Sequence, residues 1–119
     1  MSVVAESFGG RIASPGRFPE LGTLLARIKE AYNPIDVILY GSQARGEATA
    51  RSDWDLKVIV PDETPERVFS PMFGWRIQEG SGVYADLSCT RLSDFRADLK
   101  VANSAASHMV HDGVVLNVR

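Results

Sequence analysis

The chain has little of what marks secreted or membrane proteins. Its single cysteine, Cys89, can form no internal disulfide, and no paired-cysteine metal motif exists. The segment from Met1 to Arg17 contains Glu6 and Arg11 and no long apolar run, so neither a secretory signal nor a membrane span is expected there. These absences predict a protein of a reducing compartment, the cytoplasm, with no membrane partner.

No charge of either sign dominates the chain. The formal net charge is -2 and the sequence pI is about 5.6, so the chain lacks the broad positive field with which proteins bind long nucleic acids. Hydrophobic residues make up 45% and charged residues 24%, the balance of an ordinary globular protein. A chain of 119 residues can build one core of useful size. The composition therefore predicts one packed domain, whose substrate is small or carried by a protein.

The pattern of apolar and turn-forming residues predicts an irregular arm over residues 1–17 and one domain over residues 18–119. The expected elements are a helix over 19–32, a strand over 35–40, a helical turn after Gly41, a strand over 54–60, a short helix over 66–70, a hairpin with arms over 75–79 and 83–89, a helix over 93–112 with Ser93 as its N-cap, and a strand over 114–118. This order predicts an α/β (α+β) fold. The proline-broken stretch 61–74 receives no firm layout.

Gly41 and Ser42 mark a turn from a strand into a helix. Such a turn presents free backbone N–H groups and the positive end of a helix dipole, where a phosphate can bind. Gly41 allows close approach, the Ser42 hydroxyl can donate to a phosphate oxygen, and Arg45 lies three residues on, near the same side. The three residues are candidates for phosphate binding. Each taken alone is more often a simple turn or surface residue.

Three aspartates predict a metal site. Asp53 and Asp55 are two apart on a strand, so their carboxylates project from one face toward the same point. Their repulsion would be relieved by a divalent cation, and Mg²⁺ prefers one or two carboxylates together with phosphates and water. Asp86 lies on the polar face of the strand 83–89 and adds a third carboxylate. For an isolated Asp-x-Asp, or for Asp86 alone, a solvated surface acid is the alternative.

Taken together, these motifs resemble a known family. Gly41-Ser42, ten intervening residues, Asp53-Trp54-Asp55 and the later strand acid Asp86 resemble the nucleotidyltransferase superfamily to which DNA polymerase beta belongs, and most closely its minimal nucleotidyltransferases. The resemblance covers most of the chain and implies a small mixed sheet flanked by helices. At Gln43 the chain departs from the pattern, since such proteins often have arginine there.

The resemblance also implies a reaction. Asp53 and Asp55 would hold two Mg²⁺ ions, and Asp86 would complete the site nearest the attacking hydroxyl and take its proton. Gly41, Ser42 and Arg45 would bind the triphosphate of ATP or another nucleoside triphosphate. The expected activity is transfer of a nucleoside monophosphate, AMP from ATP, onto an acceptor with release of pyrophosphate.

The acceptor is expected on another molecule. Minimal nucleotidyltransferases resemble antitoxins that pair with a helical HEPN-type ribonuclease toxin, so a partner protein of that kind, or a homo-oligomer, is the expected context. The alternative is a non-catalytic module that masks such a toxin by contact alone. Transfer onto an antibiotic such as an aminoglycoside is a third hypothesis, which requires a drug-binding surface.

The remaining conspicuous residues have simple structural interpretations. His108 and His111 are interpreted as favourable charges near a helix C-terminus rather than metal ligands. Trp54 and Trp75 occur in expected strands and are interpreted as core residues. Cys89, on the apolar face of its strand, is interpreted as a small buried hydrophobe rather than a nucleophile.

Overall fold

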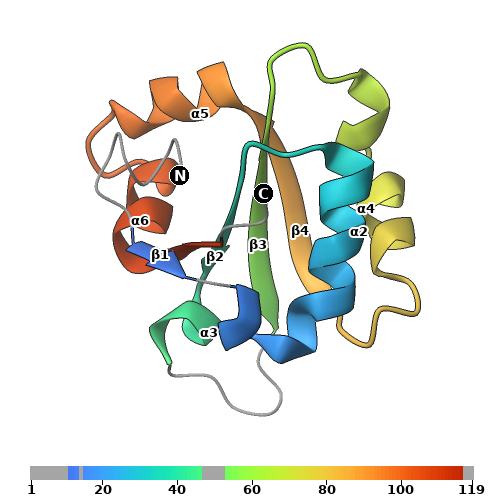
Figure 1. Cartoon of the computed structure of the whole chain (residues 1–119). Helices are drawn as coiled ribbons and strands as arrows, with labels where there is room; N and C mark the ends of the chain where they lie inside the picture. Colours follow the sequence, from blue (N-terminus) through green and yellow to red (C-terminus); the bar gives the residue numbers. More distant parts are fainter. Residues whose placement is uncertain (1–10, 14, 47–52, 117–119) are drawn as a thin grey trace.

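A computed structural model describes residues 11–13, 15–46 and 53–116, and its core is a mixed five-stranded sheet (Figure 1). The strands are β1 (Arg11–Ala13), β2 (Asp36–Tyr40), β3 (Trp54–Val60), β4 (Ala85–Arg91) and β5 (Val114–Leu116), in the spatial order β1-β5-β2-β3-β4. Pairs β1–β5 and β3–β4 are parallel, and β2 runs antiparallel to both of its neighbours. The predicted α/β (α+β) fold is confirmed.

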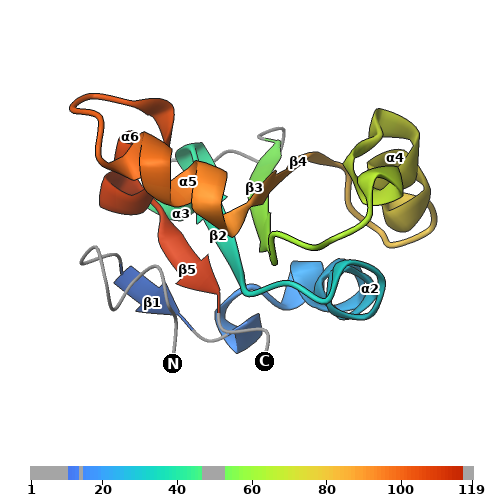
Figure 2. The same cartoon turned by 90° about the horizontal axis from the view of Figure 1, so that it is seen from above.

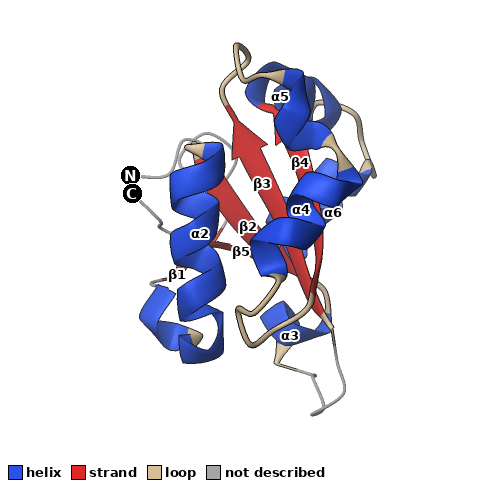
Figure 3. Ribbon diagram, turned by 90° about the vertical axis from the view of Figure 1, so that its right-hand side faces the viewer, coloured by secondary structure: helices blue, strands red, loops and turns tan. Residues whose placement is uncertain are grey.

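Helices cover both faces of the sheet. The helices are α2 (Gly22–Tyr32), α3 (Ser42–Arg45), α4 (Pro71–Gln78), α5 (Leu92–Leu99) and α6 (Ala105–Asp112), with 3₁₀ turns at Pro15–Arg17, Pro19–Leu21 and Glu66–Phe69. Viewed from above, α2 lies on one side of the strands and α5 and α6 lie on the other (Figure 2). Helix α4 lies beside α2 in front of the sheet in Figure 3. The short α3 follows β2 directly.

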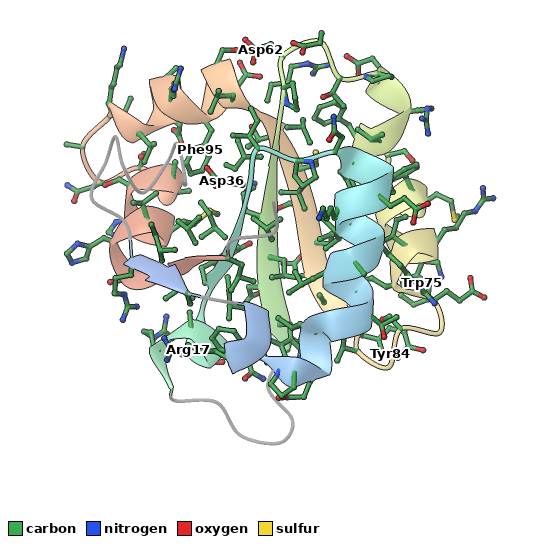
Figure 4. The ribbon with its side chains drawn as sticks, in the orientation of Figure 1. Arg17, Asp36, Asp62, Trp75, Tyr84 and Phe95 are labelled. Carbon is green, nitrogen blue, oxygen red and sulfur yellow. The ribbon has the colours of Figure 1, made fainter. Side chains whose placement is uncertain are left out.

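Strand β3 separates two hydrophobic clusters because its side chains alternate between the two faces. Trp54, Leu56 and Val58 are buried in the larger cluster, which α2 covers. Ile59 points the other way, into a smaller cluster with Phe95 of α5. Figure 4 shows Phe95 directed from α5 toward the sheet. The alternation predicted for residues 54–60 is confirmed, and it leaves Asp55 and Lys57 on the less completely covered face.

The hairpin predicted over 75–79 and 83–89 is wrong. Residues 75–78 belong to α4, and β4 pairs in parallel with β3. The start signal lies upstream: Pro71 occupies the first turn of α4, and the Ser70 hydroxyl accepts a hydrogen bond from the Phe73 N–H at 3.1 Å. Trp75 consequently lies on a helix surface, 56% exposed, and stacks on Tyr84, 66% exposed. Its predicted core position is therefore also wrong.

The single helix predicted over 93–112 is in fact two. Helix α5 ends at Leu99, Asn103 in the connection adopts a positive φ of 60° that is incompatible with a continuous helix, and Ser104 is the N-cap of α6. Ser93 is not an N-cap: it lies inside the first turn of α5, where its N–H donates to the Asp62 carboxylate at 2.9 Å. The Asp98 carboxylate near the end of α5 accepts from the Ala106 N–H at 3.1 Å and so ties α5 to the first turn of α6.

The N-cap of α6 allows a prediction about stability. The Ser104 hydroxyl accepts from the Ser107 N–H at 3.1 Å, so Ser104→Ala should lower the free energy of unfolding by about 1 kcal/mol. Urea denaturation of wild type, Ser104→Ala and Ser104→Asp checks this. Aspartate, which can cap, should retain most of the stability, and equal losses for both variants would contradict the capping role.

The arm predicted over residues 1–17 contains a strand that the sequence pattern did not indicate. Strand β1 pairs in parallel with β5, and the Arg11 guanidinium donates to the backbone oxygen of Asp112 at 2.8 Å. Residues 1–10 and 14 of the arm lie outside the described residues, as does Val118 of the predicted terminal strand. Among the helices of the described segments, none is long and apolar enough to cross a membrane.

Candidate active site

The site begins at the turn from β2 into α3. Gly41 has φ 78° and ψ -161°, a conformation that essentially only glycine adopts. Its carbonyl accepts from the N–H groups of Ala44 and Arg45, both at 3.2 Å, which closes the first turn of α3. A Cβ at position 41 would collide with the Oδ2 atom of Asp55. The glycine is therefore required both by its backbone and by the neighbouring acid.

Asp55 and Asp86 are direct register partners on neighbouring parallel strands. Tyr40 of β2, Asp55 of β3 and Asp86 of β4 form one row across three strands. Since side chains of aligned residues share a face, the two carboxylates project on the same side of the sheet. Asp53 precedes β3 and is exposed. The structure thus aligns Asp55 with Asp86 and places Asp53 immediately before the first residue of β3.

The electrostatics of Asp55 show how close these acids are. Its pKa is raised above the usual carboxyl value, first by desolvation and then by the charges of Asp86 and Asp53, while Arg45 acts in the opposite direction. The ionised form of Asp55 is therefore destabilised by its own neighbours. A positive charge placed among the three carboxylates would remove that penalty.

Tyr40 is a site residue that the sequence did not predict. Its pKa is raised, chiefly by desolvation and also by the charges of Asp86 and Asp55, and a hydrogen bond with Ser88 partly offsets this. The phenol therefore remains protonated at neutral pH. The signal was present in part, because Tyr40 directly precedes Gly41, but its position beside the acids depends on long-range strand pairing.

Comparison with known families identifies the kind of domain that contains this site. Residues 21–109 match the family described as the nucleotidyltransferase domain. The chain belongs to this family. The match spans the turn at Gly41, all three aspartates and most of α6, so the resemblance to the polymerase beta-like superfamily is confirmed. Comparison with curated proteins and comparison with solved structures each find no match.

Membership in the nucleotidyltransferase domain family supports transfer of a nucleotide as the general activity. The family generally uses a nucleoside triphosphate and Mg²⁺, so the donor atoms of this chain can be tested against that ion. Within the described residues, no three His, Cys, Asp or Glu side chains are grouped closely enough to hold a metal by themselves. Mg²⁺ needs one or two carboxylates when phosphates and water supply the other ligands, and the aligned Asp55 and Asp86 fit that requirement.

The raised pKa of Asp55 predicts a pH dependence of stability in the nucleotidyltransferase domain. The folded state binds the Asp55 proton more tightly than the unfolded chain, so the free energy of unfolding should fall as pH rises from the usual carboxyl pKa through the raised one. Urea denaturation between about pH 4 and pH 7 measures this slope. It should flatten in Asp55→Asn and with saturating Mg²⁺. A wild-type slope unchanged by both would contradict the assignment.

A cavity of ≈ 270 Å³ lies beside the Gly41 turn of the domain. It is lined by Tyr40, Gly41 and Arg45 on one side and by His108 and Met109 of α6 on the other. Arg45 and Gly41, two of the predicted phosphate-binding residues, thus face one space. Ser42 begins α3 and is half-buried.

The structural roles predicted for Trp54, Cys89 and His111 agree with the structure, and His108 has an additional position. Trp54 is buried in the core, as predicted. Cys89 packs against the larger hydrophobic cluster, and burial raises its thiol pKa to about 11, which agrees with the interpretation as an unreactive hydrophobe. His111 lies in the last turn of α6, as predicted for a C-terminal charge, whereas His108 also borders the cavity beside Gly41.

Proposed function

We propose that this nucleotidyltransferase domain moves AMP from ATP onto an acceptor in a Mg²⁺-dependent reaction that releases pyrophosphate. The observation that carries the proposal is the row formed by Asp55 and Asp86 on adjacent strands, with Gly41 packed directly against the Asp55 carboxylate. This arrangement puts the turn that we propose to bind phosphate beside a like-charged pair. A cation and a polyphosphate together complement both features.

Each site residue has a defined role in the proposal. Gly41, Ser42 and Arg45 bind the triphosphate tail and keep the α-phosphorus near Asp55. Asp53, Asp55 and Asp86 hold Mg²⁺, which when bound supplies positive charge to the phosphates and the entering oxygen. Asp86, at the end of the row farthest from Gly41, receives the proton of the attacking hydroxyl. The entering oxygen then bonds to the α-phosphorus as the bond to pyrophosphate breaks.

For the acceptor, we propose a partner protein of the HEPN-type ribonuclease class, with this domain as its antitoxin. Support comes from the Gly-Ser and Asp-x-Asp spacing, which resembles the minimal nucleotidyltransferases, and from the family match. On this proposal, modification of the ribonuclease neutralises it. In the alternative, neutralisation by contact alone, the aspartates are dispensable.

The test combines enzyme assay and intact mass. Wild-type protein incubated with ATP, Mg²⁺ and a co-expressed HEPN-type ribonuclease should release pyrophosphate and add AMP units to the ribonuclease mass. An Asp53→Asn/Asp55→Asn double variant should do neither. Glu30→Gln, which alters an exposed carboxylate on α2, is the matched control and should behave as wild type. Neutralisation that persists in the double variant would establish masking instead.

A further inference from the structure

Exposed apolar side chains gather on the outer face of α4. The described residues expose five large hydrophobic side chains, and three of them, Met72, Trp75 and Tyr84, lie together there. Met72 and Trp75 are one turn apart on α4, and the Trp75 ring stacks on Tyr84 with 5.8 Å between the ring centroids (Figure 4). Single exposed hydrophobic residues are ordinary, whereas a contiguous group of them marks an interaction site. The outer face of α4 therefore has the composition of an interface.

Two opposite charges lie on this same face. Arg76 follows Trp75 directly, and Glu79 is the residue immediately after α4. With Met72 they follow the i, i+3, i+4, i+7 spacing of one helix face, and all of them are exposed. Arg76 and Glu79 are close enough in sequence to pair with each other, yet neither side chain forms an ion pair with any described residue. We call this set the α4 patch: Met72, Trp75, Arg76, Glu79 and Tyr84.

Helix α4 is anchored to the rest of the domain. The buried Gln78 accepts a hydrogen bond from the Ala85 N–H at 2.7 Å, and Arg27 of α2 donates to the Ile77 carbonyl at 3.1 Å. The helix lies beside β4, at the opposite end of the molecule from β1 (Figure 2). Because an anchored helix is already ordered before association, binding through its outer face has a small entropic cost.

The α4 patch is complementary to itself. Across a two-fold axis, a residue that contacts a second residue of the other copy is matched by the reverse contact. When two α4 helices run antiparallel with Arg76 of one opposite Glu79 of the other, the axis creates a second, identical ion pair. The two Trp75 residues then lie five positions apart, about 7.5 Å along the helices, within reach of their indole rings. One patch thus supplies both the paired charges and the aromatic anchors of an interface.

We propose that the α4 patch is the contact surface of a symmetric dimer of this chain, formed by antiparallel packing of two α4 helices. A different protein could cover the exposed Trp75 and Tyr84 rings, but a second copy also presents the complementary charge to both Arg76 and Glu79. The proposal does not depend on nucleotidyl transfer, because every residue of the α4 patch lies outside the proposed phosphate and metal sites.

Sedimentation equilibrium of the full chain measures the association. Wild type should form a reversible dimer as its concentration rises through the micromolar range. Trp75→Ala should weaken the dimer by on the order of thirtyfold or more, because the central aromatic anchor is lost. Arg76→Glu and Glu79→Arg should each weaken it by about tenfold or more, because like charges then face each other. Arg96→Glu, which reverses an exposed arginine on α5, is the matched control and should dimerise as wild type does.

Exchange of the two charges separates the proposed contact from a general loss of folding. The double variant Arg76→Glu/Glu79→Arg should recover the wild-type association, because the ion pairs form again with reversed signs. An equimolar mixture of the two single charge variants should form heterodimers, which native mass spectrometry resolves from homodimers because the two chains differ in mass. A wild type that stays monomeric, a dimer unaffected by Trp75→Ala, or charge variants that do not recover on exchange would overturn the proposal.

Discussion

Replacing Asp55 with asparagine is expected to reduce nucleotidyl transfer by about a thousandfold or more while making the metal-free protein more stable. Activity is expected to fall because an amide at position 55, against Gly41 and beside Asp86, cannot supply the negative charge proposed to hold the cation. The stability rises because desolvation and two neighbouring carboxylates already disfavour the charge of Asp55. Pyrophosphate release and the melting temperature in EDTA measure the two effects on one preparation.

The opposite signs of these effects make the prediction specific. A substitution that merely damaged the fold would lower activity and melting temperature together, whereas loss of a functional charge separates them. Glu30→Gln should change neither quantity. Undiminished transfer by Asp55→Asn, or a lower melting temperature in EDTA, would show that Asp55 is not the strained metal ligand proposed here.

The second large effect is expected from Gly41→Ala, with Gly46→Ala as its matched control. Both glycines have positive φ, 78° and 74°, but a Cβ at Gly46 meets nothing within 4 Å, whereas one at Gly41 meets Asp55. Gly46→Ala should lower the free energy of unfolding by about 1 kcal/mol and leave transfer intact. Gly41→Ala should cost about 2–3 kcal/mol and reduce transfer by on the order of a hundredfold.

Urea denaturation and initial rates of pyrophosphate release test this pair. The difference between the two alanine variants combines the collision with the Asp55 carboxylate and the greater backbone strain at Gly41, whose ψ of -161° lies outside the left-handed region that Gly46 occupies with ψ 15°. If both variants lose the same stability and the same activity, the close approach of Gly41 to Asp55 has no functional consequence.

Elements determined by neighbouring residues could be predicted from the sequence, whereas features determined by contacts between distant segments could not. Strand β3 was predictable because buried and polar residues alternate within seven consecutive positions. The turn at Gly41 and the end of α6 before Gly113 were also local signals. The metal-binding and phosphate-binding roles of Asp53, Asp55, Asp86, Gly41, Ser42 and Arg45 stay predictions until measured.

The misassigned elements were those that local pattern describes ambiguously. Trp75–Glu79 has strand-like composition, yet the Ser70 cap and Pro71 start a helix before it. The apolar spacing from Phe95 to Met109 continues across Asn103, whose left-handed conformation the spacing could not indicate. The alignment of Tyr40, Asp55 and Asp86 depends on strand register, and the facing of Lys57 toward Asp98 depends on how α5 returns over the sheet. Both are set by contacts between distant segments.

The close packing of Gly41 on Asp55 also links two positions that lie far apart along the chain. Because a side chain at position 41 and the carboxylate at position 55 compete for the same volume, a larger residue at 41, although still strained in its backbone, should cost less when residue 55 is smaller. Selection for suppressors of a defective Gly41 variant should therefore recover folded proteins altered at position 55, and these proteins will have regained solubility without regaining chemistry. In natural relatives, the loss of glycine at this turn should accordingly mark domains that have given up transfer and retain only binding.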